Sequence, residues 1–236
     1  MTRVLNDYEF YLRSELLAGH ADPYEVSSPR DELEKLRFFA RQVQEFINQA
    51  EQSEVESLRL SVQHLPKDTQ DDFWMWNYPI HWDEIFRSTF RFSIVVSLAT
   101  FLETFIRRLC YRVALLTKSE LSAAELEHFT LKDERKFLQA VGRFQKPIQP
   151  AWDEIGLFKK IRNVIVHNSG FTAKSKYKKA IETFCRNRSD IRLCYEVIDI
   201  DPEFIEFMIN QLVEFVDQLG KGFMLLCERT RALENS

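Results

Sequence analysis

The apolar residues along the chain recur mainly at the spacing of amphipathic helices. A first helix is expected over Arg3–Ala18, ending at Gly19. Ser28-Pro29 marks a second helix start, because serine caps helices and proline suits the first turn, and the pattern then runs to about Pro66. Its apolar positions, spaced by three and four, predict a buried stripe of Leu33, Leu36, Phe39, Ala40, Val43, Phe46 and Ile47.

The segment from Trp82 to Leu116 is apolar on most sides through its middle, which predicts the central helix of a bundle. Just before it lies the aromatic cluster FWMWNYPIHW, Phe73–Trp82, where Pro79 favours a loop or short helix. Its rings could stack on nucleobases or pack against the bundle or a partner subunit. We favour packing, since most aromatic residues are buried.

The second half of the chain continues the helical pattern with one exception. Helix-like segments occur within Lys118–Pro150, a helix is expected from Asp153, and a basic loop with one or two helical turns should follow Gly170. Residues Ile191–Ile200 are rich in β-branched and aromatic types and predict a lone strand or half of a small hairpin. A last helix starts at Pro202, and Gly220 and Gly222 should weaken its far end.

Together these elements predict an all-α helical bundle with one short β segment near residues 191–200. We expect a single domain over residues 1–236, in which residues 1–82 form N-terminal helices and an aromatic linker packed on a core of residues 83–236. The hydrophobic fraction of 45% and charged fraction of 29%, with only six glycines, are typical of a folded, helix-rich protein.

Composition also limits the chemistry. The four cysteines have no CxxC spacing, so we expect free thiols, no bound metal and no cofactor. The amino terminus lacks the pattern of a secretory signal, and the most apolar stretch, Phe92–Leu102, has 11 residues, against roughly 20 for a bilayer span. A cytoplasmic protein without a membrane partner is therefore expected.

Charge is distributed unevenly around a net value of −4. Residues 1–72 hold fifteen acidic and eight basic residues, whereas Lys159–Arg192 holds ten basic residues and two acidic ones. A basic segment can be a solvated face, but it also suits a polyanionic partner such as RNA. The candidate RNA-binding residues are Lys159, Lys160, Lys174, Lys176, Lys178 and Lys179.

The helix expected from Asp153 carries a polar group of three residues near its end. With Ile155, Phe158, Ile161 and Ile165 facing the core, Arg162, Asn163 and His167 share another side. Asn163 and His167 are one turn apart, so the amide could orient the ring, while Arg162 could hold a phosphate through two contacts. Asn168 and Gly170 suit a left-handed helix end, which places His167 in the last turn, where histidine can exchange protons near neutral pH.

The stretch Arg162-Asn163-Val164-Ile165-Val166-His167, followed by Asn168-Ser169-Gly170, resembles the R-x4-H signature of HEPN domains. The resemblance extends in layout from about Asp83 to the C-terminus, through the long apolar helix with FLETFIRRLC, but only the hexapeptide is specific. HEPN domains are small helical bundles, and many are metal-independent ribonucleases of toxin–antitoxin, abortive-infection and other antiviral systems.

The resemblance implies roles for the matching residues. His167 would activate the ribose 2′-hydroxyl, Arg162 would bind the scissile phosphate, and Asn163 matches the polar residue that follows the arginine. The products would carry 2′,3′-cyclic phosphate and 5′-hydroxyl ends. The active form would be a homodimer with a composite site, under the control of a possible antitoxin or other inhibitory protein. Glu103 would support the site by orienting Arg162.

One departure and two alternatives qualify this interpretation. Toxins of the family that are silenced by nucleotide transfer carry a tyrosine two residues after the histidine, where this chain has Ser169, so that form of regulation is not expected. A non-catalytic HEPN-type module could bind RNA or a nucleotide, or mediate dimerisation, without cleavage. A purely structural helical scaffold would need neither Arg162 nor His167.

Overall fold

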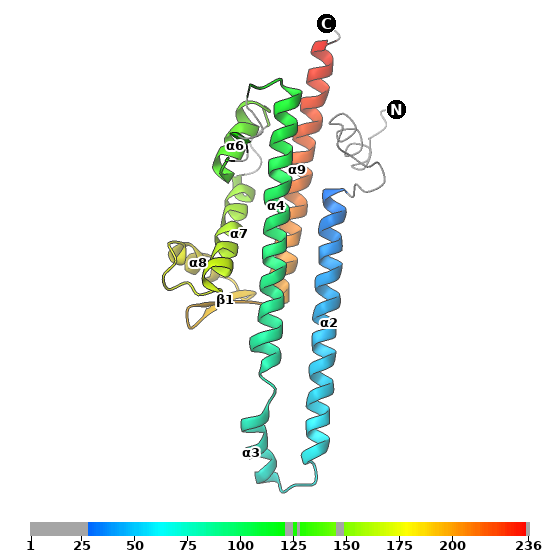
Figure 1. Cartoon of the computed structure of the whole chain (residues 1–236), viewed down its shortest axis with the longest axis vertical. Helices are drawn as coiled ribbons and strands as arrows, with labels where there is room; N and C mark the ends of the chain where they lie inside the picture. Colours follow the sequence, from blue (N-terminus) through cyan, green and yellow to red (C-terminus); the bar gives the residue numbers. More distant parts are fainter. Residues whose placement is uncertain (1–27, 121–124, 127, 145–148, 235–236) are drawn as a thin grey trace.

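Three long helices form the body of the protein in the computed structural model, which describes residues 28–120, 125–126, 128–144 and 149–234. They are α2 (Pro29–Val62), α4 (Ser88–Leu116) and α9 (Pro202–Glu234). Helices α4 and α9 run in the same direction and α2 runs opposite to them (Figure 1). The helix expected over Arg3–Ala18 lies outside the described residues.

Shorter elements complete the bundle. Helix α3 (Lys67–Asn77) and the π-helical turn η1 (Trp82–Arg87) connect α2 to α4, and α6 (Leu131–Ala140) and α7 (Gln149–Asn168) pack on the other side of α4. Helix α8 (Lys178–Cys185) and the strands β1 (Ile191–Cys194) and β2 (Val197–Ile200) lie beside the lower end of α7 (Figure 1). The all-α prediction with a short β segment is confirmed.

Local sequence signals explain where helices begin. The Asp31 backbone N–H donates to Ser28 Oγ at 3.1 Å, and the Ser28 N–H donates to Asp31 Oδ2 at 3.3 Å. This reciprocal capping box confirms the predicted start at Ser28-Pro29. Thr130 and Asp133 form the same box at the start of α6. Helix α7 begins at Gln149, about one turn before the predicted start at Asp153.

The core surrounds α4, as the sequence predicts. Ile94, Leu98, Leu102 and Ile106 of α4 are at most 2% exposed and belong to one hydrophobic cluster with residues of α2, α7 and α9. The stripe predicted on α2 is narrower than expected. Leu33, Ala40 and Ile47 are buried, but Phe39 and Phe46 are 53% and 67% exposed, because α2 contacts the bundle along a single line of residues.

Two other expectations change. The segment Ile191–Ile200 forms a complete antiparallel hairpin, with Ile191 opposite Ile200, and its turn residues Tyr195 and Glu196 take φ values of 48° and 66°. Helix α9 continues through Gly220 and Gly222 to Glu234. Gly222 is needed for packing, since a Cβ atom there would lie 2.8 Å from the Phe144 ring.

The aromatic cluster before α4 divides between packing and exposure. The Trp82 indole N–H donates to Glu54 Oε2 of α2 at 2.8 Å, and its ring lies 4.8 Å from that of Phe86. Met75 and Trp76 are 71% and 82% exposed.

The stretch Lys67–Leu116 contains a window that is apolar enough and long enough to cross a membrane. The core helix of a soluble protein can meet the same criterion, and 33% of this window is buried.

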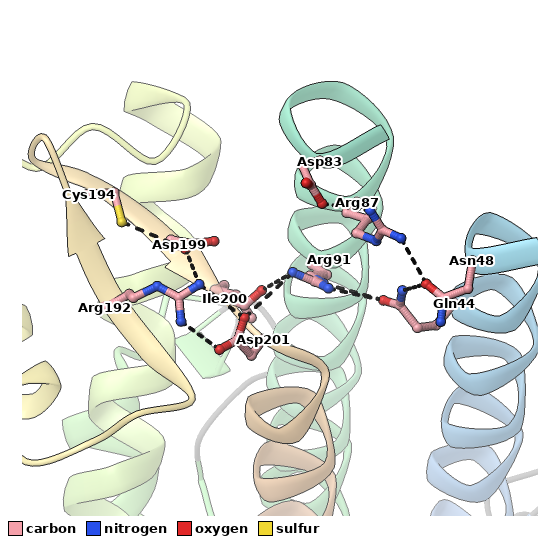
Figure 2. A network of polar contacts seen from close by, with 10 residues as sticks. All are labelled: Gln44, Asn48, Asp83, Arg87, Arg91, Arg192, Cys194, Asp199, Ile200 and Asp201. Carbon is pink, nitrogen blue, oxygen red and sulfur yellow. Dashed lines mark hydrogen bonds and ion pairs between the residues drawn. The ribbon is translucent and has the colours of Figure 1, made fainter. Parts of the chain in front are cut away.

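A polar network ties the hairpin to α4 and α2 (Figure 2). Arg91 of α4, whose side chain is 13% exposed, donates from Nη1 to the Ile200 carbonyl at 2.7 Å and contacts Gln44 of α2 at 3.4 Å. Burial lowers the pKa of Arg91 from its ordinary value. Asp201 lies 3.9 Å from Arg91 and 2.7 Å from Arg192, so one arginine anchors the end of β2 to the central helix.

Replacing this anchor should destabilise the protein. We expect Arg91→Met to lower the free energy of unfolding by about 2 kcal/mol, because the carbonyl of the buried Ile200 loses its charged donor. Arg30→Met is the matched control, since Arg30 is 54% exposed in its ion pair with Asp217, and it should change stability by less than about 0.5 kcal/mol. Urea denaturation measures both, and equal effects would contradict the anchoring role.

Candidate functional site

The end of α7 separates an apolar face from a polar one. Ile155, Phe158, Ile161 and Ile165 are buried in the core, as predicted from their spacing. Arg162 and Asn163 are half-buried and His167 is exposed. The helix therefore uses its apolar side for stability and leaves the three polar residues at the bundle surface.

The Arg162 guanidinium is largely unused within the described structure. Its Nη1 donates to Asn163 Oδ1 at 3.0 Å. Its Nε is enclosed and has no hydrogen-bond partner among the described residues. No carboxylate of the described residues forms an ion pair with Arg162. A half-buried arginine with free donors is suited to an anionic ligand.

Asn163 and His167 lie one turn apart on α7, as predicted, but the expected contact between them is not formed. The amide oxygen of Asn163 accepts from Arg162 instead. Within the described ranges, no hydrogen bond to the His167 ring is found. The histidine is thus accessible to a ligand or a second protein molecule, and Asn163 orients the arginine.

The helix ends through Ser169 and Gly170, with φ values of 50° and 84°. The Gly170 N–H donates to the Val164 carbonyl at 3.2 Å, and the Phe171 N–H donates to the Asn168 carbonyl at 2.9 Å. The prediction for Gly170 holds, but Ser169 and not Asn168 takes the other left-handed position. Asn168 remains the last helical residue.

Two neighbours hold this helix end in place. A Cβ atom on Gly170 would lie 2.7 Å from the Phe92 ring of α4, so the backbone approaches α4 closely. On the other side, the Ile198 N–H of β2 donates to the Gly170 carbonyl at 3.0 Å. The fully buried Thr172 donates to the Glu196 carbonyl from its backbone N–H and its hydroxyl, both at 2.8 Å. His167 is therefore positioned by α4 and the hairpin together.

Glu103 makes a different contact from the one expected. It forms an ion pair with Lys159 of α7 at 3.1 Å, whereas it was expected to orient Arg162. The reason is helical geometry: Lys159 lies on the turn of α7 that passes Glu103, about one turn before Arg162. Nearby, Glu134 of α6 is only 4% exposed, and burial raises its pKa to about 7.

A cavity of about 490 Å³ opens between α6 and α7. We call it the α6–α7 pocket. Four cationic residues contribute to its wall, together with three aromatic residues, Gly156 and Asn163. The cations are Lys132, Arg135, Lys159 and Lys160, and the aromatic residues are Phe129, Trp152 and Tyr177. Through Asn163 the pocket adjoins the hydrogen bond that orients Arg162.

The structure brings together only some of the predicted RNA-binding lysines. Lys159 and Lys160 line the pocket. Lys174 and Lys176 are exposed in the segment that precedes α8, and Lys179 is exposed in the first turn of α8. Lys178 forms an ion pair with Glu196 and lies 3.9 Å from Glu182, so its charge is already balanced.

Sequence reasoning missed Lys132, Arg135 and Gly156 as site residues. Lys132 and Arg135 belong to a short polar helix whose pattern indicates only a solvated face, and nothing local shows that this face borders a pocket shared with α7. Gly156 interrupts an otherwise apolar helical pattern, and a glycine inside a helix is a sequence signal that could have indicated a functional position.

Four exposed apolar or aromatic residues lie at the end of α7 and on the hairpin that pairs with the chain after it. Val166 precedes His167 on α7, and Phe171 forms a β-bridge with Val197. The exposed fractions are 47% for Val166, 40% for Phe171, 97% for Tyr195 and 37% for Val197. We call these four residues the α7-end patch. Exposed apolar side chains of this kind are suited to burial by a second molecule.

Substitution of Gly170 should disturb the site. We expect Gly170→Ala to lower the free energy of unfolding by about 1–3 kcal/mol, because the new Cβ combines a left-handed φ with a clash against Phe92. In Gly156→Ala the Cβ meets nothing within 4 Å, and removal of a helical glycine should stabilise by about 0.5–1 kcal/mol. Thermal and urea denaturation would show the opposite signs; a neutral Gly170→Ala would contradict the close approach.

Glu134 should make stability depend on pH. Its pKa in the folded state, about 7, exceeds its ordinary value of 4.5, so ionisation opposes folding. The free energy of unfolding should therefore fall between these two pH values, by up to roughly 3 kcal/mol, and stay low above them. Glu134→Gln should remove this fall in urea denaturation at about pH 5 and pH 8. Glu84→Gln, at an exposed carboxylate, should keep it; a fall retained in Glu134→Gln would refute the assignment.

Within the described residues, no group of three or more histidine, cysteine, aspartate or glutamate side chains is arranged to hold a metal ion. No protein-family model, curated protein or solved structure matches the chain. The end of α7 and the α6–α7 pocket are therefore the features of the molecule that indicate a function.

Proposed function

We propose that this protein is a metal-independent endoribonuclease of the HEPN type, acting in the cytoplasm. The observation that carries the proposal is the Arg162 guanidinium, which is oriented by Asn163 and leaves its remaining donors without partners among the described residues. The accessible His167 lies on the same helix, five residues further on. An imidazole can act as the general base for a 2′-hydroxyl, and an arginine without an ion pair among the described residues can stabilise the charge on the phosphate.

The chemistry assigns a separate task to each residue. His167 would accept the proton of a ribose 2′-hydroxyl, whose oxygen then attacks the adjacent phosphorus atom. The bond from phosphorus to the 5′-oxygen breaks, which leaves a 2′,3′-cyclic phosphate and a 5′-hydroxyl that takes up a proton. Arg162 would donate to the non-bridging phosphate oxygens, where negative charge increases in the transition state.

A second copy of the chain would complete the site. One histidine cannot be both unprotonated for the attack and protonated for the leaving oxygen in the same step, whereas two copies supply both forms. The α7-end patch supports such a homodimer, because it exposes four apolar or aromatic side chains, among them Val166, which precedes His167 in the sequence. In a two-fold dimer the same patch would contact itself, so the two histidines would face one cleft.

The biological setting follows from the resemblance alone. A ribonuclease of this type would belong to a toxin–antitoxin or anti-phage defence system and would require an inhibitory protein to limit RNA cleavage in the uninfected cell. The exposed surface around His167 is the part of the molecule that such an inhibitor would have to cover.

A second candidate function is RNA or nucleotide binding without cleavage. The α6–α7 pocket favours it. Its cationic and aromatic lining could hold a ligand, and the described lining residues include neither Arg162 nor His167. The two candidates differ in one measurable outcome, the length of the RNA after incubation.

Loss of either motif residue should abolish cleavage. We expect His167→Ala and Arg162→Ala each to reduce the rate of single-stranded RNA cleavage at least about 100-fold, with an unchanged circular dichroism spectrum. The parent protein should keep its full activity in EDTA. Arg162→Lys should restore little activity, because lysine lacks the two-pronged donor geometry. His64→Ala, at an exposed histidine near the far end of α2, is the control and should cleave like the parent.

The outcome separates the two candidates. Cleavage that persists in both His167→Ala and Arg162→Ala would overturn the ribonuclease proposal. Binding of RNA by the parent without any shortening of the RNA would support the non-catalytic module instead.

A further inference from the structure

We propose that the α6–α7 pocket binds a nucleoside phosphate, with the phosphate held by lysines and the base placed against aromatic rings. This inference rests on the proposed function in one respect: the bound nucleoside phosphate is taken to be part of the RNA strand that reaches Arg162. A free mononucleotide presents the same chemistry, and the experiment below distinguishes these two sources.

Charge in the pocket points to an anion. Of its four cations, Lys159 is paired with Glu103 at 3.1 Å and Arg135 lies 3.9 Å from Asp153. Lys132 and Lys160 have no ion pair with any residue that the structure describes. Lys132 is exposed on α6 and Lys160 is half-buried on α7, so the two ammonium groups come to the pocket from different helices. They are the residues available to a phosphate.

The aromatic residues supply the second half of the recognition. Trp152 is 3% exposed and packs against Phe215 with ring centroids 4.8 Å apart, so it is a rigid part of the wall. Phe129 and Tyr177 are half-buried and keep part of their surface open. Rings beside cations suit a nucleobase linked to a phosphate, because stacking on aromatic faces tolerates any base.

Space in the pocket depends on Gly156. This residue lies within α7, one turn after Trp152 and one turn before Lys160, and a Cβ atom there would meet nothing within 4 Å. A glycine inside a helix is unfavourable by comparison with alanine, so its open environment calls for an explanation. The pocket provides one, since a larger side chain at this position would occupy the ligand's volume.

The pocket is also connected to the proposed cleavage site. Asn163 contributes to the pocket wall and accepts the hydrogen bond from Arg162. A nucleotide held between α6 and α7 would therefore lie next to the residue that orients the arginine. The pocket would position the RNA strand, while Arg162 and His167 act on a neighbouring phosphate.

Binding is best measured in the His167→Ala background, so that RNA stays intact. Fluorescence anisotropy with a short labelled single-stranded RNA should show that Lys132→Ala/Lys160→Ala raises the Kd about tenfold at low salt. The same double variant should lower the slope of log Kd against log salt by about 1.4, because each phosphate that a lysine no longer neutralises contributes about 0.7. The charge-matched control Lys35→Ala/Lys221→Ala should change the Kd less than about twofold. Both control lysines are exposed and lie outside the pocket.

A second pair of variants tests the pocket without changing charge. Gly156→Leu should fill the cavity and raise the Kd about tenfold while its stability remains at least that of the parent, because leucine favours the helix. Gly220→Leu is the matched control and should bind like the parent, because Gly220 is also a helical glycine whose Cβ would meet nothing within 4 Å and it lies outside the pocket. Their comparison separates loss of space from loss of folding.

Competition by AMP and by inorganic phosphate identifies the ligand. If AMP displaces the RNA and phosphate at the same concentration does not, a single nucleotide is sufficient for binding in the pocket. If AMP does not displace the RNA but the variants still weaken binding, the ligand of the pocket is the RNA strand. Equal weakening by the charge-matched control, parental binding in Gly156→Leu, or competition by phosphate as strong as by AMP would overturn the proposal. These outcomes do not depend on cleavage, so a parent that binds in the pocket but never shortens RNA would refute the ribonuclease alone.

Discussion

The burial of α4 is the constraint on which the other elements depend. Its middle turns bury Ile94, Leu98, Leu102 and Ile106 and expose only a polar strip that includes Thr100, and α2, α6, α7, α9 and β2 all contact it. An apolar helix of this kind removes its surface from water only when several partners surround it. Each partner then presents its remaining face outward. The polar face of α7 lies at the bundle surface because its isoleucines and Phe158 are needed around α4 and α9.

The same constraint gives the candidate site its rigidity. Gly170 approaches Phe92 of α4, the following residues pair with β2, and Arg91 of α4 holds the far end of β2 through the Ile200 carbonyl. The helix end that carries His167 is thus connected to α4 at two points. Arg162 is oriented within its own helix by Asn163. Catalytic and binding groups need fixed geometry, and here it comes from backbone contacts and one buried arginine.

Much of the fold could be predicted from local sequence signals, because they act over a few residues. The Ser28-Pro29 start, the central helix and the apolar face of α7 follow from capping and spacing. The exposure of Phe39 and Phe46 could not be predicted, since it depends on how many neighbours α2 has. The partner of Glu103 likewise depends on the register between α4 and α7, which no periodicity specifies.

For the site, the sequence identified Arg162, Asn163 and His167 on one helix, and the structure adds the surroundings. Lys132 and Arg135 reach the pocket only because α6 and α7 both pack on α4, which brings together segments about 20 to 30 residues apart. The hydrogen bond from Arg162 to Asn163, in place of one between Asn163 and His167, depends on side-chain rotamers that a helical wheel does not contain.

The most direct test of the account is the chemistry of the RNA ends that the purified protein produces in the presence of EDTA. Single-stranded RNA should be cut into fragments with 2′,3′-cyclic phosphate and 5′-hydroxyl ends, as expected for attack by the ribose hydroxyl next to Arg162 and His167. RNA that remains intact at high protein concentration, or fragments with 5′-phosphate and 3′-hydroxyl ends, would contradict it.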